Sequence, residues 1–175
     1  MTEHREIDLR FQHTGRAICC HVIDGWLVDP GPGSSLPALL EALAGECPRG
    51  VLLTHIHLDH AGGTGQLLRE LGPLPVYVQE RGARHLIDPS RLLASAERIY
   101  GDQMGPLWGT IVPVPAEHVR VLGDADDPPG FRWAYTPGHA VHHAAYLHEQ
   151  TGIAFSGDVA GVRIGDGPVL PPTPP

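Results

Sequence analysis

Four potential metal ligands are crowded into one short stretch of this chain, and this feature restricts the possible folds most strongly. His55, His57, Asp59 and His60 lie within six positions of residues 54–63, which read THIHLDHAGG. Imidazole nitrogen and carboxylate oxygen are donors that suit Zn²⁺, Fe and Mn²⁺. A structural zinc site would more naturally use cysteine, and no cysteine is near. The stretch therefore predicts a metal centre that performs chemistry.

The spacing of the four ligands suggests how they divide between ions. Residues 50–54 are predicted to form a short buried strand, and residues i and i+2 of a strand share a face. His55 and His57 can therefore bind one ion together, while Asp59 and His60 fall in a turn and can face a second. A metal loop at the carboxyl end of a strand is where open sheets place their ligands. The alternative, a surface turn rich in histidine, is disfavoured because protonated imidazoles would repel one another.

Three further strand ends carry polar residues of the same kind. His139 follows the predicted strand 131–136, and Asp158 follows the strand 153–156. Asp29 ends the strand 26–29, where it is either a solvated turn carboxylate or an acceptor that orients a metal-binding histidine. Together with the first cluster, His139 and Asp158 form a plausible ligand set.

The apolar pattern predicts one domain over residues 1–175, with a proline-rich tail at 166–175 and no folded element after it. A chain of 175 residues can bury a real core. Periodicity predicts helices around Leu36–Leu43, Thr64–Leu71 and Glu80–Ile87 and at 91–104. It predicts strands at 7–11, 16–23, 26–29, 50–54, 75–79, 119–122, 131–136, 144–148 and 153–156.

Composition excludes several classes of function. The net charge of −8 disfavours a sequence-independent nucleic-acid binder. The charged N-terminus has no apolar signal region, and no run approaches a membrane-spanning length. Cys19 and Cys20 are neighbours on a predicted strand, point to opposite faces and suit packing better than a disulfide framework. These observations predict a reduced, cytoplasmic protein that binds neither nucleic acid nor membrane.

Three residues are weaker candidates for a substrate pocket. Tyr100 and Trp108 lie towards the end of a helical insert, where they either belong to the core or form the wall of a pocket beside the metal loop. His142 lies close to His139 in sequence, and its role is open.

The motifs together resemble those of the metallo-β-lactamase superfamily. Residues 55–60 look like the family's HxHxDH motif, residues 136–139 like TPGH, and Gly157-Asp158 like GD. Residues 28–31 resemble an early DTG-like turn. The TPGH-x-x-x-H arrangement is similar to the glyoxalase II-like branch. The resemblance implies an α/β fold, an αββα sandwich of two mixed β-sheets flanked by helices.

The resemblance also implies a role for each ligand. By motif position, His55, His57 and His139 match the first metal site, and Asp59 and His60 match the second. Asp158 matches the carboxylate that bridges both ions. Two more residues match supporting positions: His143 a histidine that holds the loop, and Asp29 an acceptor that orients a ligand. The cofactor implied is Zn²⁺, one or two ions per chain, with Fe or Mn as alternatives.

The implied activity is metal-dependent hydrolysis of a small acyl substrate such as a thioester, a lactone or a similar ester or amide. A metal-activated hydroxide would attack, positioned by Asp59 and Asp158, and Asp59 is the better candidate to pass a proton to the leaving group. One alternative is an iron-dependent sulfur dioxygenase. The other is a metal-binding fragment with impaired catalysis.

The C-terminal region departs from the family pattern. The family's second metal normally takes one more histidine from beyond the GD motif, and residues 159–175 contain none. We therefore expect a C-terminally incomplete domain with a weak second site. We also expect an exposed apolar face near the C-terminus, or a homodimer through that region.

Overall fold

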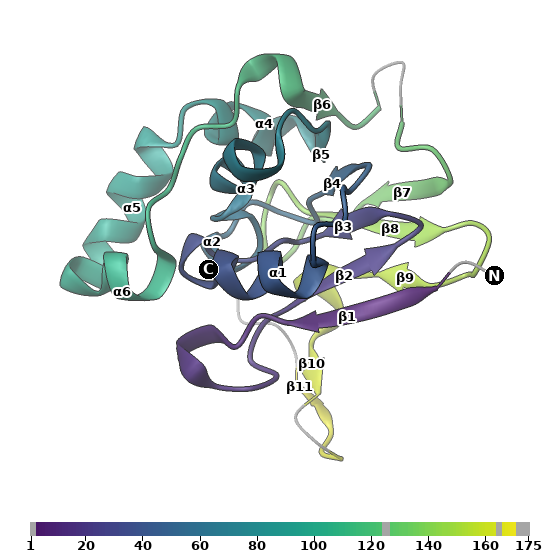
Figure 1. The fold of residues 1–175 in the computed structure, drawn as a ribbon, viewed down its shortest axis with the longest axis horizontal. Helices are drawn as coiled ribbons and strands as arrows, with labels where there is room; N and C mark the ends of the chain where they lie inside the picture. Colours follow the sequence, from purple (N-terminus) through teal and green to yellow (C-terminus); the bar gives the residue numbers. More distant parts are fainter. Residues whose placement is uncertain (1–2, 124–126, 164–165, 171–175) are drawn as a thin grey trace.

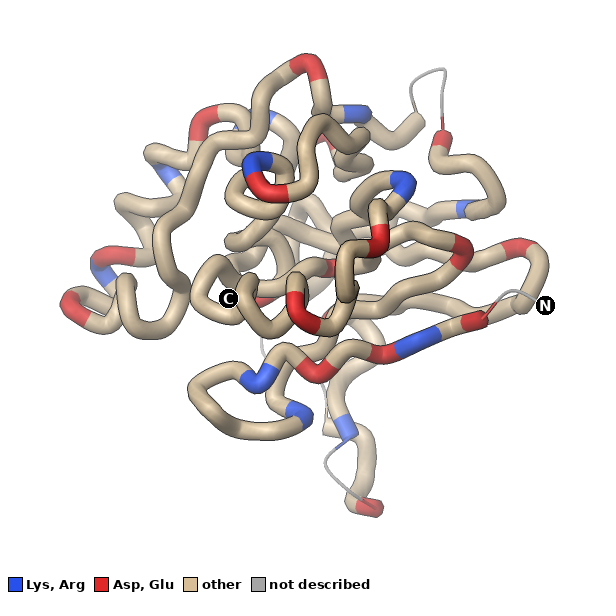
Figure 2. Tube along the Cα trace, viewed as in Figure 1, with Lys and Arg blue, Asp and Glu red and all other residues tan. Residues whose placement is uncertain are grey.

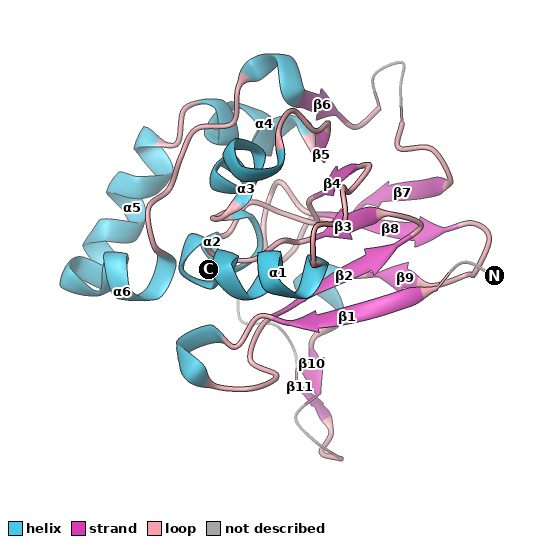
Figure 3. Cartoon of the chain, viewed as in Figure 1, coloured by secondary structure: helices cyan, strands magenta, loops and turns pink. Residues whose placement is uncertain are grey.

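The computed structural model describes residues 3–123, 127–163 and 166–170 and contains two stacked β-sheets with helices (Figures 1 and 3). The first sheet has six strands in the order β1-β2-β3-β4-β5-β6. Its first three strands are antiparallel, and pairing from β3 to β6 is parallel, so this sheet is mixed. The strands are β1 (His4–Asp8), β2 (Cys19–Ile23), β3 (Trp26–Val28), β4 (Gly50–Leu52), β5 (Val76–Val78) and β6 (Val119–Val121).

The second sheet has three antiparallel strands, β7 (Phe131–Tyr135), β8 (Ala144–His148) and β9 (Ala154–Phe155). A separate hairpin, β10 (Val162–Arg163) with β11 (Val169–Leu170), projects from the body of the molecule (Figure 1).

Six α-helices complete the described fold. Figure 1 shows α5 and α6 at one end of the sheets and α4 near β5 and β6. The helices are α1 (Leu36–Leu43), α2 (Leu58–Ala61), α3 (Thr64–Leu71), α4 (Glu80–Ile87), α5 (Ser90–Tyr100) and α6 (Met104–Trp108).

The layers follow from alternation along the central strands, because successive side chains of a strand point to opposite faces. In β3, Leu27 joins a core shared with α1, α3 and α4, whereas Trp26 and Val28 join a core shared with the second sheet. Tyr77 of β5 also faces the second sheet, and its neighbours on the strand face the helices. The first sheet is thus buried on both faces, as the sandwich prediction requires. Among the described residues, one core joins the helices to the first sheet, and the other core joins the first sheet to the second.

Two local predictions are confirmed in detail. Asp24 and Gly25, between β2 and β3, have φ values of 47° and 76°, the left-handed conformation that a two-residue hairpin turn needs. Cys20 is buried in the helix-side core, while Cys19 is exposed on the opposite face of β2.

Two predictions about local structure need correction. Strand β4 ends at Leu52, so His55 and His57 lie on the loop after it, and Asp59 and His60 lie on the one-turn helix α2. The strand stops because the Thr54 backbone N–H donates to Asp29 Oδ1 at 2.8 Å and not to a neighbouring strand. Residues 169–170 of the proline-rich tail pair with β10, and residues 171–175 lie outside the described part.

The surface bears on three further expectations. Val162, Val169 and Leu170 are 44–59% exposed, as expected for an apolar face near the C-terminus; dimerisation through it stays a prediction. Charged residues of both signs are distributed along the described chain (Figure 2), and the expectation that no nucleic acid binds is untested. None of the helices in the described ranges combines the length and apolar character needed to cross a bilayer.

Candidate metal centre

The centre is assembled from the ends of three strands in two sheets. The segment after β4 carries His55 and His57, and α2 carries Asp59 and His60. The loop after β7 carries His139. The short 3-10 turn after β9, Gly157–Ala160, carries Asp158. The structure therefore brings the six sequence-predicted ligands from distant parts of the chain into one region.

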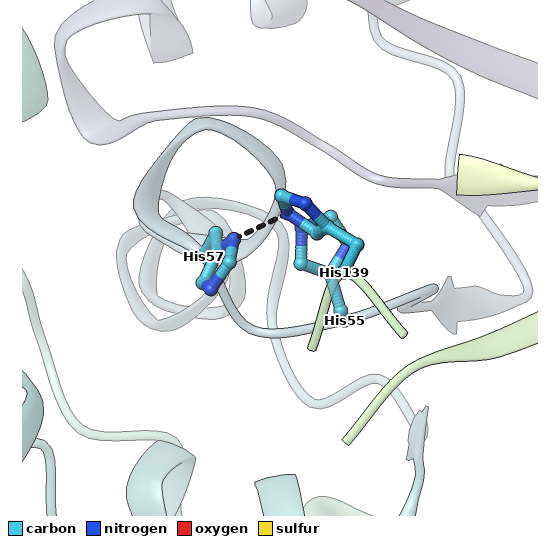
Figure 4. A group of neighbouring side chains, drawn as sticks. All are labelled: His55, His57 and His139. Carbon is cyan, nitrogen blue, oxygen red and sulfur yellow. Dashed lines mark hydrogen bonds between the residues drawn. The ribbon is translucent and has the colours of Figure 1, made fainter. Parts of the chain in front are cut away.

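His55, His57 and His139 form the first ligand group, with donor atoms all within 4.8 Å of one another. His139 Nε2 lies 2.9 Å from His57 Nδ1 (Figure 4). Burial, followed by the neighbouring His60 and His57, strongly lowers the pKa of His55. Burial and His139 lower the pKa of His57. Neutral imidazoles offer a lone pair, so both histidines are in the state that a cation requires.

The second ligand group is His55, His60 and Asp158, again with donor atoms within 4.8 Å. Asp158 Oδ1 lies 3.2 Å from His60 Nε2, and Asp158 Oδ2 lies 3.5 Å from His139 Nε2. One carboxylate therefore faces a histidine of each group. The hydrogen bond from His60 is the main reason why the pKa of Asp158 is lowered, and the carboxylate is ionised near neutral pH.

Asp59 stands at the margin of the centre. It belongs to neither group of three, but its Oδ2 lies 3.5 Å from His60 Nε2. Its side chain is 38% exposed, against 17% for that of His60. Asp59 is thus placed between the ligands and solvent, where a group that exchanges protons with water would be expected.

Asp29 anchors the centre from behind. Its Oδ1 accepts the Thr54 backbone N–H at 2.8 Å, and its Oδ2 accepts the Thr54 hydroxyl at 2.6 Å. The same Oδ2 lies 2.9 Å from His60 Nδ1. A histidine bonded through Nδ1 presents Nε2 to its ligand in a fixed direction. Asp29 is 7% exposed, so of its two sequence readings the structure supports the orienting one.

The pKa of His60 is shifted in the opposite direction from those of His55 and His57. Burial alone would lower its pKa, but Asp29, Asp158 and Asp59 outweigh burial and raise the pKa of His60 well above its ordinary value. Three carboxylates around a buried histidine create a demand for positive charge. In the metal-free chain a proton on His60 supplies this positive charge, and a divalent ion at Nε2 would supply it in the metal-bound chain.

His143 and His142 support the first group. His143 is fully buried, shares a 2.8 Å hydrogen bond through Nδ1 with the Thr136 hydroxyl, and stacks on His55 at a centroid separation of 5.0 Å. His142 Nδ1 accepts the Ile56 backbone N–H at 3.4 Å, and its ring lies 5.5 Å from that of His57. Burial lowers the pKa of each to about 4. The structure places both histidines around the ligands.

Two clefts open onto the centre. One of about 740 Å³ is lined by His60, His139 and Asp158 together with residues of β1, β2 and β9. The other, of about 420 Å³, is lined by His57, Asp59, His139 and Asp158 and by the aromatic rings of Tyr100 and Trp108. Tyr100 and Trp108 pack edge to face, 5.1 Å between centroids. Both aromatic residues therefore line the cleft beside the ligands, and Trp108 also belongs to a core with Leu58 and Ala96.

Two residues of the centre were missed by sequence reasoning. Thr54 binds Asp29 twice and lies 3.1 Å from His55 Nδ1 through its hydroxyl. Gly157 has φ 49°, and a Cβ there would lie 2.5 Å from His143 Nε2 and 2.7 Å from Thr54 Oγ1. The only signals were a threonine that ends an apolar strand and a glycine before Asp158, and neither reveals these long-range contacts.

The residues present fit a divalent cation. His55 Nε2 is buried and has no hydrogen-bond partner in the described part of the chain. An unpaired buried polar atom costs about 1–3 kcal/mol. Coordination of a metal ion together with His57 and His139 would explain this unpaired atom. The nitrogen-rich donor set with carboxylates suits Zn²⁺, Fe or Mn²⁺ better than Mg²⁺ or Ca²⁺.

Sequence comparison agrees with this geometry. The family model of the metallo-beta-lactamase superfamily matches residues 23–172, and this chain belongs to that superfamily. Members of the superfamily are mostly hydrolases, and the fold generally binds divalent metals. The expectation of fold and family from the four motifs is therefore confirmed.

Individual relatives are similar over most of this chain. The metallo-beta-lactamase fold-containing protein ST1585 of Sulfurisphaera tokodaii is 34% identical over 71% of this chain and 49% of its own. Its crystal structure superposes with a TM-score of 0.79, covering 100% of this chain and 70% of that one, at 27% identity. A hydroxyacylglutathione hydrolase of Salmonella paratyphi A is 31% identical over 69% of this chain and 37% of its own. The chain thus spans about half or less of these curated relatives' length.

A third similarity concerns a metal-bound structure. TTHA1623, solved in a di-iron-bound form, is 28% identical and superposes with a TM-score of 0.55, covering 98% of this chain and 76% of that one.

Proposed function

We propose that this chain is a metal-dependent hydrolase acting on a small acyl substrate, with a thioester as the preferred class. The observation that carries the proposal is the position of Asp158, whose two carboxylate oxygens face His60 of one ligand group and His139 of the other. Such a carboxylate can join two cations into one centre. The zinc assignment belongs to this proposal.

The residues divide the work by position. His55, His57 and His139 would hold one ion, and His60 with Asp158 the other. Divalent ions bound there would lower the pKa of a water molecule towards neutrality and polarise the substrate carbonyl. Asp29 keeps His60 Nε2 pointed inwards through the 2.9 Å bond to Nδ1, so the centre is organised before substrate arrives.

Proton transfer is assigned to Asp59. Its carboxylate lies 3.5 Å from His60 Nε2 and lines the 420 Å³ cleft. It can orient the attacking water, accept its proton and deliver that proton to the leaving group. A thiolate leaves without a proton more readily than an alkoxide does. Because Asp59, the proton donor of this site, is partly solvated, the site favours thioesters over other esters.

The substrate class is supported by the cleft and by one relative. Tyr100, Trp108 and Ile99 give the 420 Å³ cleft an apolar wall beside Asp59, which suits the hydrocarbon part of an acyl group. Hydroxyacylglutathione hydrolase, 31% identical over the matched residues, is named after an acylated glutathione, and an acyl group on the glutathione sulfur is a thioester.

The test is a substrate panel on zinc-loaded protein: a hydroxyacyl-glutathione thioester, a lactone and a β-lactam. We expect thioester hydrolysis with the highest kcat/KM. Asp59→Asn should lower kcat by about 10²–10⁴-fold with metal retained. Asp102→Asn, at an exposed carboxylate, is the matched control and should leave kcat unchanged. Bound metal without hydrolysis of any substrate would contradict the proposal and favour a metal-binding role without catalysis.

Iron is the second metal to test, because TTHA1623 has been solved in a di-iron-bound form. The iron-loaded chain would be assayed for the same hydrolysis and for oxygen uptake on a persulfide substrate. Oxygen uptake without thioester hydrolysis would replace the hydrolase proposal with the sulfur dioxygenase alternative.

A further inference from the structure

A third cluster of metal-binding side chains lies outside the centre, on the edge strand β1 and its neighbour β2. His4 and Glu6 are two positions apart on β1 and share a face of the sheet, and Glu6 is paired directly with His21 of β2. The face is the one opposite Ile7 and Cys20, which belong to the helix-side core. The register therefore gathers His4, Glu6 and His21 in one patch.

The donor atoms of this patch are close enough for one ion. One donor atom each from His4, Glu6 and His21 lie within 4.8 Å of one another. His4 Nε2 is 3.2 Å from His21 Nδ1. Two imidazole nitrogens at that separation can share one proton or one cation, and they cannot both be protonated without repulsion.

The ring orientations are held by packing. His4 and His21 stack at 5.3 Å with an interplanar angle of 28°. Both rings also contact Phe155 of β9, at centroid separations of 5.7 and 5.3 Å. Burial and His4 lower the pKa of His21, which leaves its lone pair available at neutral pH. The exposed Glu6 supplies negative charge and a path to solvent.

We propose that His4, Glu6 and His21 bind a divalent transition-metal ion of the zinc class, at a site that lines the 740 Å³ cleft and shares no ligand with the catalytic centre. Two imidazoles and one carboxylate select Zn²⁺ over Mg²⁺ and Ca²⁺. The ion joins β1, the edge strand, to β2, so its role is to fasten the start of the first sheet. Cys19 contacts the other ring nitrogen of His21, with Sγ 3.8 Å from Nε2, and so helps to hold the ring that presents Nδ1 to the site.

The test counts zinc by equilibrium dialysis of metal-stripped protein against Zn²⁺ alone. His21→Ala should bind one zinc fewer per chain than wild type. Glu6→Gln, at an exposed position, should weaken zinc binding at this site by about tenfold or more, equivalent to about 1.4 kcal/mol. His13→Asn is the matched control, because His13 is an exposed histidine outside both clusters and asparagine tolerates its φ of 60°. It should bind as much zinc as wild type.

A second measurement isolates the site from the centre. The double variant His55→Ala/His139→Ala should retain one zinc, and that zinc should raise its urea midpoint. Adding Glu6→Gln to the double variant should reduce both the amount of bound zinc and the increase in the urea midpoint. Zinc counts that are equal in wild type, His21→Ala and Glu6→Gln would overturn the proposal. Hydrolysis by the same variants is read separately, so failure here leaves the catalytic proposal untouched.

Discussion

Replacing Asp29 tests how the centre is held together. Its carboxylate accepts three hydrogen bonds, two from Thr54 and one from His60, at 2.6–2.9 Å, and it is 7% exposed. In Asp29→Ala, the Thr54 hydroxyl can turn to His55 Nδ1, 3.1 Å away. The Thr54 N–H and His60 Nδ1 remain buried and unpaired, at about 1–3 kcal/mol each, and His60 loses a charge partner. We expect the free energy of unfolding to fall by about 3–5 kcal/mol.

The assay is urea unfolding of metal-stripped protein, with two comparison variants. Asp29→Asn keeps an acceptor for the Thr54 N–H and tolerates the φ of 52°, so we expect a loss of about 1–2 kcal/mol. Asp24→Ala is the matched control: Asp24 also has a positive φ and an ion pair, but its side chain is 44% exposed. The control should lose about 0–1 kcal/mol. An Asp29→Ala loss no larger than that of Asp24→Ala would refute the anchoring role.

Two further predictions concern packing and pH. Gly157→Ala should lower the unfolding free energy by about 1–3 kcal/mol, because the new Cβ meets His143 and Thr54 at a φ of 49°. Gly152→Ala, with φ 72° and open space, is its control, and an equal loss would contradict the steric explanation. On acidification of metal-stripped protein, the unfolded chain protonates His142 and His143 near pH 6.5 but the folded chain only near pH 4, since burial lowers both pKa values. The urea midpoint should therefore fall between pH 6.5 and 4, more steeply than in His142→Gln, and a midpoint that rises would contradict this reasoning.

Local patterns were sufficient for much of the fold. Helices α3 and α4 and strand β8 have the boundaries expected from the sequence, because each shows a clear apolar periodicity between turn residues. The ligands also came from the sequence, since His55, His57, Asp59 and His60 are neighbours in the chain. Their positions after predicted strands suggested His139 and Asp158, and the motif resemblance then implied a role for each.

Long-range contacts were beyond the sequence. Asp29 could be a solvated turn carboxylate or an acceptor that orients a histidine. The sequence could not decide, because the carboxylate binds Thr54, which is 25 positions away. The end of β4 at Leu52 has the same cause. The cluster of His4, Glu6 and His21 depends on the register between two strands, which no pattern within either strand specifies. Pairing of β10 with residues 169–170 is likewise a contact between strands that the local pattern of neither strand specifies.

The central claim is that His55, His57 and His139 hold a metal ion. The most direct measurement is metal content per chain in protein prepared without chelator, compared between wild type and His139→Ala. The difference reports on this centre alone, because His139 is not part of the His4 cluster. The account predicts at least one divalent ion fewer in the variant. Folded wild-type protein without metal, or equal metal content in both proteins, would contradict it.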